Sequence, residues 1–125
     1  MSAIARKNLI AVVDDDELVR GALQRLLKAS SLGAVSFGSA EDLLKSGQLP
    51  DIACLIVDIR MPGMSGLELQ TKLKAERCRI PIIFITAHGD AKMQTEAMRD
   101  GAVKFLAKPF DNIVLLEAVH AALED

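Results

Sequence analysis

Aspartate, threonine and lysine side chains directly follow or end four apolar runs of the sequence. These side chains belong to Asp14, Asp15, Asp58, Thr86 and Lys108. Three carboxylates brought within a few ångströms would repel one another by roughly 4 kcal/mol per close pair at an intermediate dielectric, so such a cluster needs a cation. A small site with only oxygen ligands favours Mg²⁺ over Zn²⁺. A metal-bound carboxylate beside a lysine and a hydroxyl is a set of groups suited to phosphoryl transfer, with a carboxylate as nucleophile.

These side chains can meet only if the runs before them are strands of one parallel sheet. Residues 52–57 form a continuous apolar run bounded by Pro50 and by Pro62-Gly63, which is typical of a strand buried on both faces. The carboxyl ends of such strands lie along one edge of the sheet, where ligand sites form. Asp58 by itself could merely begin the turn that follows. Four polar strand ends in matched positions favour a shared site.

Strand-like and helix-like segments alternate along the whole chain. We expect strands at residues 9–13, 34–37, 52–58, 81–86 and 103–107. We expect helices from the acids at 16–17 to 28, at residues 39–45, 65–76 and 91–100, and from 111 to the end. Gly33 is expected to end the first helix or the turn after it. This alternation predicts one α/β domain of three layers, a (βα)5 fold whose parallel five-stranded sheet has the flavodoxin-like order 2-1-3-4-5.

The acids after the first run have two different explanations. Asp16 and Glu17 suit the first turn of a helix, through capping and the helix dipole. Asp14 and Asp15 lie on the strand side of the junction, where helix initiation explains them poorly. Arg20 falls on the polar face of the expected helix, opposite its apolar stripe.

Composition excludes several classes of function. A formal net charge of -2 and only four aromatic residues, all Phe, argue against a nucleic-acid surface. Two cysteines are too few for a disulfide framework; Cys54 is expected in the core and Cys78 as an exposed free thiol. The sequence shows neither a signal-peptide pattern nor an apolar stretch of membrane-spanning length. We therefore expect a soluble, cytoplasmic protein.

Taken jointly, four motifs resemble the receiver domains of response regulators in two-component signalling, the CheY-like superfamily. They are Val13-Asp14-Asp15, Asp58 with Met61-Pro62-Gly63-Met64-Ser65-Gly66, Thr86-Ala87, and Lys108-Pro109-Phe110. The loop after Asp58 and the last motif look most like regulators of the FixJ type. The resemblance implies that residues 1–125 form a receiver domain, a signalling switch that a histidine kinase activates by Mg²⁺-dependent phosphoryl transfer to Asp58.

The resemblance also implies a role for each matching residue. Asp15, Asp58 and the backbone carbonyl of Arg60 would bind Mg²⁺ directly, and Asp14 would act largely through water. Thr86 and Lys108 would contact phosphoryl oxygens. The bond between Lys108 and Pro109 would be cis, an isomer that X-Pro bonds tolerate. Phe105 would be a switch aromatic that turns inward as Thr86 moves, although by itself it is simply a half-buried strand residue.

Partners and output are implied only by analogy. We expect a sensor histidine kinase and a homodimer on phosphorylation. The output would be either a C-terminal effector domain outside this chain, of transcriptional type, or a separate partner. Direct nucleic-acid binding by this domain and membrane association are not expected. The helix at residues 91–100 has few apolar positions, namely Met93, Ala97 and Met98, so it should be among the least firmly packed elements.

Other functions stay open at this stage. One is a pseudo-receiver that binds partners without phosphorylation. Another is a phosphohydrolase of the haloacid-dehalogenase type, which needs a second acid two residues after its nucleophile, where this chain has Arg60. A flavin or nucleotide binder is disfavoured because acids, not a glycine-rich loop, follow the first strand. Arg60 and His88 are solvated loop residues or, alternatively, a shield for the acyl phosphate; His120 has no evident role.

Overall fold

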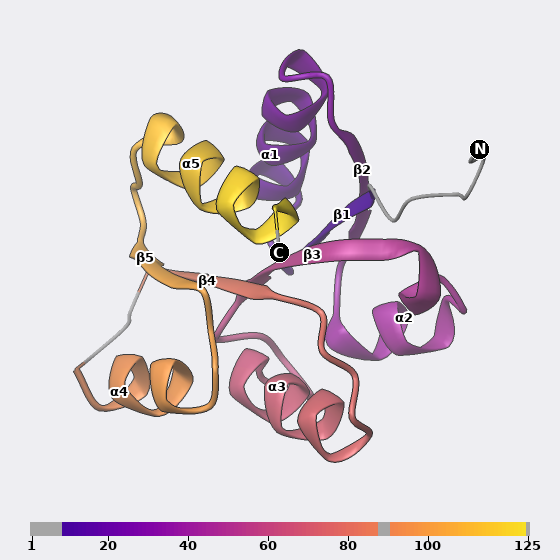
Figure 1. The fold of residues 1–125 in the computed structure, drawn as a ribbon, viewed down its shortest axis with the longest axis vertical. Helices are drawn as coiled ribbons and strands as arrows, with labels where there is room; N and C mark the ends of the chain where they lie inside the picture. The colour runs from indigo at the N-terminus through magenta and orange to yellow at the C-terminus, as the bar shows by residue number, and fades with distance from the viewer. Residues whose placement is uncertain (1–8, 88–90, 125) are drawn as a thin grey trace.

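Five parallel strands form one sheet across the part of the chain that the computed structural model describes, residues 9–87 and 91–124 (Figure 1). They are β1 (Leu9–Val13), β2 (Gly33–Phe37), β3 (Ile52–Asp58), β4 (Ile82–Thr86) and β5 (Lys104–Ala107). Their order in the sheet is β2-β1-β3-β4-β5, and every neighbouring pair is parallel. The predicted α/β class and strand order are therefore confirmed.

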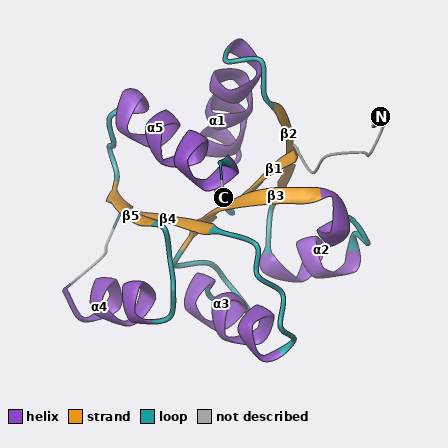
Figure 2. Ribbon diagram, in the orientation of Figure 1, coloured by secondary structure: helices purple, strands orange, loops and turns teal. Residues whose placement is uncertain are grey.

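Helices cover both faces of this sheet, which gives the three predicted layers (Figures 1 and 2). The helices are α1 (Glu17–Ala29), α2 (Ala40–Lys45), α3 (Gly66–Ala75), α4 (Ala91–Arg99) and α5 (Asn112–Leu123), with one 3-10 turn, η1 (Leu49–Asp51). Helices α1 and α5 pack on one face, and α2, α3 and α4 on the other. No helix among the described residues is long and apolar enough to cross a membrane.

The apolar core is split by the sheet into two clusters of buried side chains. On β1, Ile10 and Val12 face α1 and α5, whereas Ala11 and Val13 face the other three helices. Strands β1, β3 and β4 alternate in this way along nearly their whole length, so almost every one of their residues is buried. This is why their sequences are continuously apolar, as expected for central strands of a parallel sheet.

Short polar side chains fix where several helices begin. Asp16 accepts a hydrogen bond from Leu18 N at 2.9 Å at the start of α1. Ser39 does the same for Asp42 N at 3.0 Å, and Ser65 forms a reciprocal capping box with Glu68. Such caps satisfy amides that have no partner within the helix. The predicted helix-initiating role of Asp16 is confirmed.

The end of α1 differs from the prediction. Gly33 does not end the helix; it is the first residue of β2 and pairs with Leu9. The helix is closed instead by Ser31, whose φ of 62° is left-handed, and by a hydrogen bond from Leu32 N to Leu27 O at 2.9 Å. This is the closure usually made by glycine.

The same closure at the end of α3 corrects the prediction for Cys78. Arg77 adopts a φ of 59°, and Cys78 N donates to Leu73 O at 2.8 Å. This turn brings Cys78 inward, as the residue after such a cap commonly contacts the last helical turn. Cys78 is therefore partly buried against the core rather than exposed, whereas Cys54 is fully buried, as predicted.

Smaller differences concern element boundaries and the packing of α4. Strand β4 begins at Ile82 rather than at residue 81, and β5 begins at Lys104 rather than at residue 103. Only Ala97 is fully buried in α4, and Met98 is 41% exposed, so Met98 does not belong to its packed face. The expectation that α4 is thinly packed agrees with this burial.

Candidate functional site

The polar residues predicted to meet lie along one edge of the sheet. Asp14 directly follows β1, Asp58 ends β3, Thr86 ends β4, and Lys108 directly follows β5. The strand register aligns these ends, since Val13 pairs with Val57, Asp58 with Ile85, and Thr86 with Ala107. Residues far apart in the sequence are thus brought to the carboxyl edge of the sheet, where ligand sites form in this architecture.

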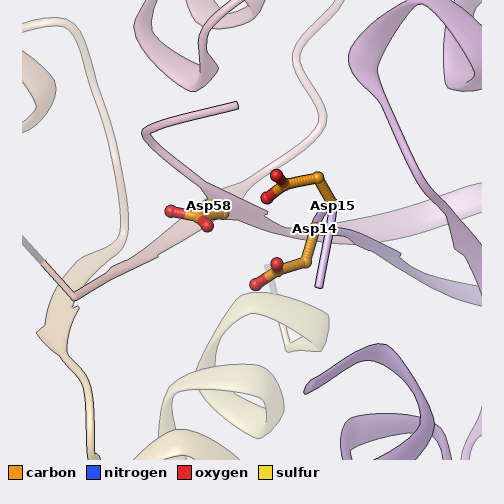
Figure 3. Close-up of side chains that lie close together, drawn as sticks. All are labelled: Asp14, Asp15 and Asp58. Atoms are coloured by element: carbon orange, nitrogen blue, oxygen red, sulfur yellow. The ribbon is translucent and has the colours of Figure 1, made fainter. Parts of the chain in front are cut away.

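Three carboxylates gather at this edge (Figure 3). One oxygen from each of Asp14, Asp15 and Asp58 lies within 4.8 Å of the others. Asp14 is fully buried and Asp58 is 6% exposed, whereas Asp15 is exposed. The oxygens therefore form an acidic cluster that is buried at Asp14 and Asp58 and exposed to solvent at Asp15.

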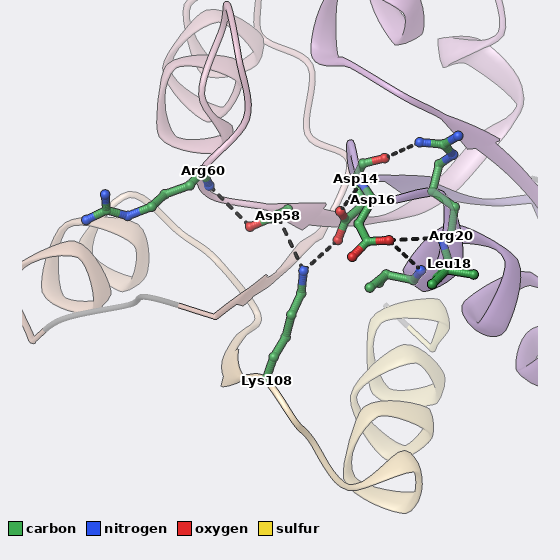
Figure 4. A network of polar contacts seen from close by, with 8 residues as sticks. Asp14, Asp16, Leu18, Arg20, Asp58, Arg60 and Lys108 are labelled. Carbon is green, nitrogen blue, oxygen red and sulfur yellow. Dashed lines mark hydrogen bonds and ion pairs between the residues drawn. The ribbon is translucent and has the colours of Figure 1, made fainter.

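Lys108 supplies positive charge to two of the three carboxylates, Asp14 and Asp58 (Figure 4). Its ammonium nitrogen lies 2.8 Å from Asp14 Oδ2 and 3.3 Å from Asp58 Oδ2. Burial alone would lower the pKa of Lys108, but its contacts with Asp14 and Asp58 outweigh burial and raise it. The lysine is therefore held in its charged form between two carboxylates.

The charge balance at Asp58 is different. Burial and the neighbouring charge of Asp14 raise the pKa of Asp58, and they outweigh Lys108 and the Arg60 amide, which act in the opposite direction. One ammonium thus does not fully compensate the acids around it. A further cation at this edge would remove the remaining repulsion.

Asp14 is held at all four of its polar atoms. Its backbone N–H donates to Phe37 O at 3.1 Å, and its carbonyl accepts from Arg20 Nη1 at 2.7 Å. Its Oδ1 accepts from Asp16 N at 2.8 Å, and its Oδ2 accepts from Lys108 at 2.8 Å. Asp14 is thereby fixed in place, and its role in anchoring Lys108 was not foreseen from the sequence.

The contact that Arg20 makes was not foreseen from the sequence, which placed this residue on the polar face of α1. Arg20 is only partly exposed, and its guanidinium reaches back to the Asp14 carbonyl (Figure 4). The guanidinium also lies close to Gly38, since a Cβ at Gly38 would be 3.3 Å from Arg20 Nη1. Helical periodicity places Arg20 correctly around the helix but says nothing about how far its side chain extends.

The loop after β3 folds tightly against Asp58. Arg60 N donates to Asp58 Oδ1 at 3.2 Å, and Gly66 N donates to Ile59 O at 2.8 Å. Figure 4 shows the Arg60 side chain extending away from Asp58 and Lys108, which favours its interpretation as a solvated loop residue. The loop is also bound from α2, where Glu41 Oε2 accepts from Met64 N at 2.9 Å, a contact that the sequence did not indicate.

The remaining predicted site residues lie at or near the same edge. Thr86 is buried, with 1% exposure, and its carbonyl accepts from Lys108 N at 2.8 Å. The bond between Lys108 and Pro109 is cis, the isomer expected from the sequence. Phe105 is half-buried on β5 and packs in the cluster shared with α2, α3 and α4.

Only one of the two histidines, His120, lies in the part of the chain that the structure describes. His88 lies outside the described residues. His120 is exposed on α5, and no contact among the described residues links it to the three carboxylates. The arrangement that remains is three carboxylates, a lysine and a threonine at one sheet edge.

Comparison with known proteins identifies the class that this fold and site define. A model of the response regulator receiver domain family matches residues 10–120, so the chain belongs to the receiver domains of response regulators. These domains act in two-component signalling as regulatory modules.

Among curated proteins, the chain is similar to several regulators. It is 49% identical over 119 residues to Nodulation protein W of Bradyrhizobium diazoefficiens, covering 94% of this chain and 52% of that protein. It is 43% identical over 114 residues to the transcriptional regulatory protein FixJ of Azorhizobium caulinodans, covering 91% and 54%. The chain thus spans about half the length of the curated relatives that it matches.

Solved structures agree with these matches. The crystal structure of FixJ-N is 40% identical, with a TM-score of 0.84 over 95% of both chains. The response regulator StyR is 44% identical, with a TM-score of 0.88 over 95% of this chain and 60% of that one. The resemblance to FixJ-type regulators is therefore confirmed.

Proposed function

We propose that this chain is a switch controlled by phosphorylation, which accepts a phosphoryl group on Asp58 from a sensor histidine kinase. The observation that carries the proposal is the position of Lys108 Nζ, 2.8 Å from the buried Asp14 carboxylate and 3.3 Å from Asp58. An ammonium held there can pass from a carboxylate oxygen to a phosphoryl oxygen with little movement. Membership of the receiver family supports the same role.

The donor set fits Mg²⁺. Three carboxylates lie within 4.8 Å of one another, one ammonium contacts only two of them, and all the ligand atoms are oxygens. We propose that Asp15, Asp58 and the Arg60 carbonyl hold the ion, with Asp14 acting through water. The ion would neutralise charge on the transferring phosphoryl group. Asp14, which Lys108 and three other contacts already engage, is better suited to an indirect role than the exposed Asp15.

In the proposed transfer, a carboxylate oxygen of Asp58 attacks phosphorus. The bond from phosphorus to the kinase's histidine nitrogen breaks as the new P–O bond forms, and its electron pair stays on that nitrogen, which takes up a proton. Lys108 would pair with one phosphoryl oxygen and the Thr86 hydroxyl with another. The chain therefore supplies the nucleophile and the charge stabilisation for its own modification, while serving as a regulatory domain.

We further propose that phosphorylation remodels the surface of α4 and β5 through Thr86 and Phe105. Thr86 ends β4 at the same sheet edge as the carboxylates, and its carbonyl accepts a hydrogen bond from the Lys108 amide. Phe105 is half-buried and α4 contributes one fully buried residue, Ala97, so little packing opposes a rearrangement there. This surface would control a C-terminal output domain of transcriptional type, or it would form the interface of a homodimer. We place this function in the cytoplasm.

The decisive test is incubation with Mg²⁺ and acetyl phosphate followed by intact-mass measurement of the wild type and Asp58→Asn. We expect one added phosphoryl group in the wild type and none in the variant. An adduct that persists in Asp58→Asn would assign the acceptor to another residue.

The second candidate function is a pseudo-receiver that binds partners without phosphorylation. It would be favoured if the wild type bound Mg²⁺ yet gained no phosphoryl group from acetyl phosphate or from a histidine kinase. The phosphohydrolase alternative has less support, because Arg60 occupies the position where a second acid is needed.

A further inference from the structure

The loop that joins β3 to α3 carries the backbone carbonyl of Arg60, a proposed Mg²⁺ ligand. Two hydrogen bonds within the segment shape it, from Arg60 N to Asp58 Oδ1 at 3.2 Å and from Gly66 N to Ile59 O at 2.8 Å. These bonds hold the two ends of the loop, near Asp58 and at Gly66. The middle of the loop, at Gly63 and Met64, needs another restraint.

Glu41 on α2 provides a restraint at that point. Its Oε2 accepts from Met64 N at 2.9 Å, across 23 positions of sequence. Hydrogen bonding from the Met64 amide lowers the pKa of Glu41, so the carboxylate is charged at neutral pH. Hydrogen bonds to an ionised acceptor are stronger than those to a neutral one.

Gly63 makes this contact sterically feasible. A side chain at Gly63 would put its Cβ 2.6 Å from Glu41 Oε2, closer than real contacts allow. Gly63 also has a φ of 76°, which glycine adopts at little cost. The loop therefore bends against the Glu41 carboxylate, with its backbone facing that side chain directly.

We infer that Glu41 is a positioning residue for the Mg²⁺ site, because it fixes the loop that presents the Arg60 carbonyl. This inference rests on the proposed function. Mg²⁺ requires nearly ideal octahedral geometry at short distances, so a ligand carried by a loosely held loop binds it poorly. Glu41 itself does not touch the ion.

The test compares three variants by calorimetric titration with Mg²⁺. Glu41→Ala removes the acceptor, Glu41→Gln keeps an acceptor oxygen without the charge, and Asp42→Ala removes an equal charge from the next, exposed position of α2. We expect about a tenfold weaker Kd for Glu41→Ala, at the lower end of the range for residues that orient metal ligands. Glu41→Gln should stay within about threefold of the wild type, and Asp42→Ala should bind like the wild type.

The melting temperature in EDTA separates this role from general stability. A residue that only supports the fold would lower the melting temperature without changing the Kd of the folded protein. Equal loss of affinity in Glu41→Ala and Glu41→Gln would instead indicate a long-range charge effect and overturn the inference. So would equal Kd values for Glu41→Ala and Asp42→Ala.

A measurement on the wild type covers the case in which Glu41→Ala does not fold. Coupling between two sites is reciprocal, so Mg²⁺ should slow hydrogen exchange at the Met64 amide if the two are linked. Unchanged exchange at saturating Mg²⁺ would overturn the inference. Failure of the wild type to bind Mg²⁺ at all would count against the proposed function itself. If, in that case, Glu41→Ala still speeds hydrogen exchange at the Met64 amide, the bond between Glu41 and Met64 only supports the fold, and the inference is overturned.

Discussion

Lys108 places its ammonium nitrogen 2.8 Å from Oδ2 of Asp14, and that carboxylate has no exposure to solvent. A buried charge is stable only while its partner remains. The pair therefore serves the fold as well as the proposed chemistry, because removal of the lysine would leave the Asp14 carboxylate buried without a cation beside it.

Replacing Lys108 by Met should destabilise the fold by about 2–3 kcal/mol at neutral pH, since the variant leaves Asp14 buried without its cation. Urea unfolding in EDTA measures the loss. Lys104→Met on the same strand is the control, because Lys104 is exposed, and it should change stability by less than about 0.5 kcal/mol. Similar losses of stability in both variants would mean that the contact between Lys108 and Asp14 contributes nothing beyond that of an exposed lysine.

Asp58→Asn should stabilise the protein in EDTA by about 1 kcal/mol at neutral pH, a modest gain because Lys108 and solvent screen the repulsion. The pKa of Asp58 is raised by burial and by Asp14. As pH rises, the unfolded state therefore releases the Asp58 proton before the folded state does. Above the ordinary pKa of 3.8, the free energy of unfolding of the wild type falls, because the folded state must hold an unfavourable charge at Asp58.

The gain from Asp58→Asn should accordingly be small near pH 4 and reach its full size above the raised pKa. Thermal unfolding of both proteins across this range tests the sign. A lower melting temperature for the variant in EDTA at pH 7 would argue against a repulsive cluster. Saturating Mg²⁺ should reverse the order, because it binds the wild type more tightly.

Gly66→Ala should cost at least about 2 kcal/mol, since the new Cβ has no room. It would lie 2.6 Å from the Asp58 carbonyl oxygen and 2.9 Å from Ile59 Cα, both of them backbone atoms. Gly33→Ala is the matched control, because its Cβ would meet Leu9 Cδ1 at an ordinary 3.4 Å. Chemical denaturation of the two variants compares them, and equal costs would contradict the close approach at Gly66.

The two thiols should differ in reactivity. Burial raises the pKa of Cys54 to about 12, so it stays protonated and unreactive in the folded protein at pH 8, whereas partly buried Cys78 should react with a disulfide reagent. Cys78→Ser should show no labelling until it unfolds. Labelling of folded Cys78→Ser would contradict the burial of Cys54.

The raised pKa of Cys54 also predicts how the stability of the protein changes at alkaline pH. Its thiol ionises near 9.0 when unfolded but only near 12 when folded, so the unfolded state loses the proton first. Stability should therefore fall as pH rises above about 9. Cys54→Ala should show a shallower fall over the same range, once its lower stability at neutral pH is subtracted.

The sheet and its polar edge could be predicted because both are local patterns. Continuous apolar runs reveal the central strands, and the residue at the end of each run is placed by strand direction alone. The positions of Asp58, Thr86 and Lys108 therefore needed no knowledge of side-chain contacts. Gly101, two residues after the end of α4, has a φ of 102°, a conformation that glycine adopts readily.

Other features depend on contacts between distant segments. Ser31 and Arg77 adopt left-handed conformations for which neither residue type is a signal. The reach of Arg20 to the Asp14 carbonyl, and of Glu41 to Met64, is decided by tertiary packing. A sequence pattern predicts the helix face that carries such a side chain, but not the atom that its terminal group contacts.

The sheet separates two apolar clusters, and neighbouring residues of β5 belong to different ones. Phe105 packs with α2, α3 and α4, whereas Leu106 packs with α1 and α5. A rearrangement that begins at Phe105 would therefore be transmitted on one face of the domain, while α1 on the opposite face keeps its packing. One partner could then bind at α1 in either state of the switch, while another, contacting α4, distinguishes the two states.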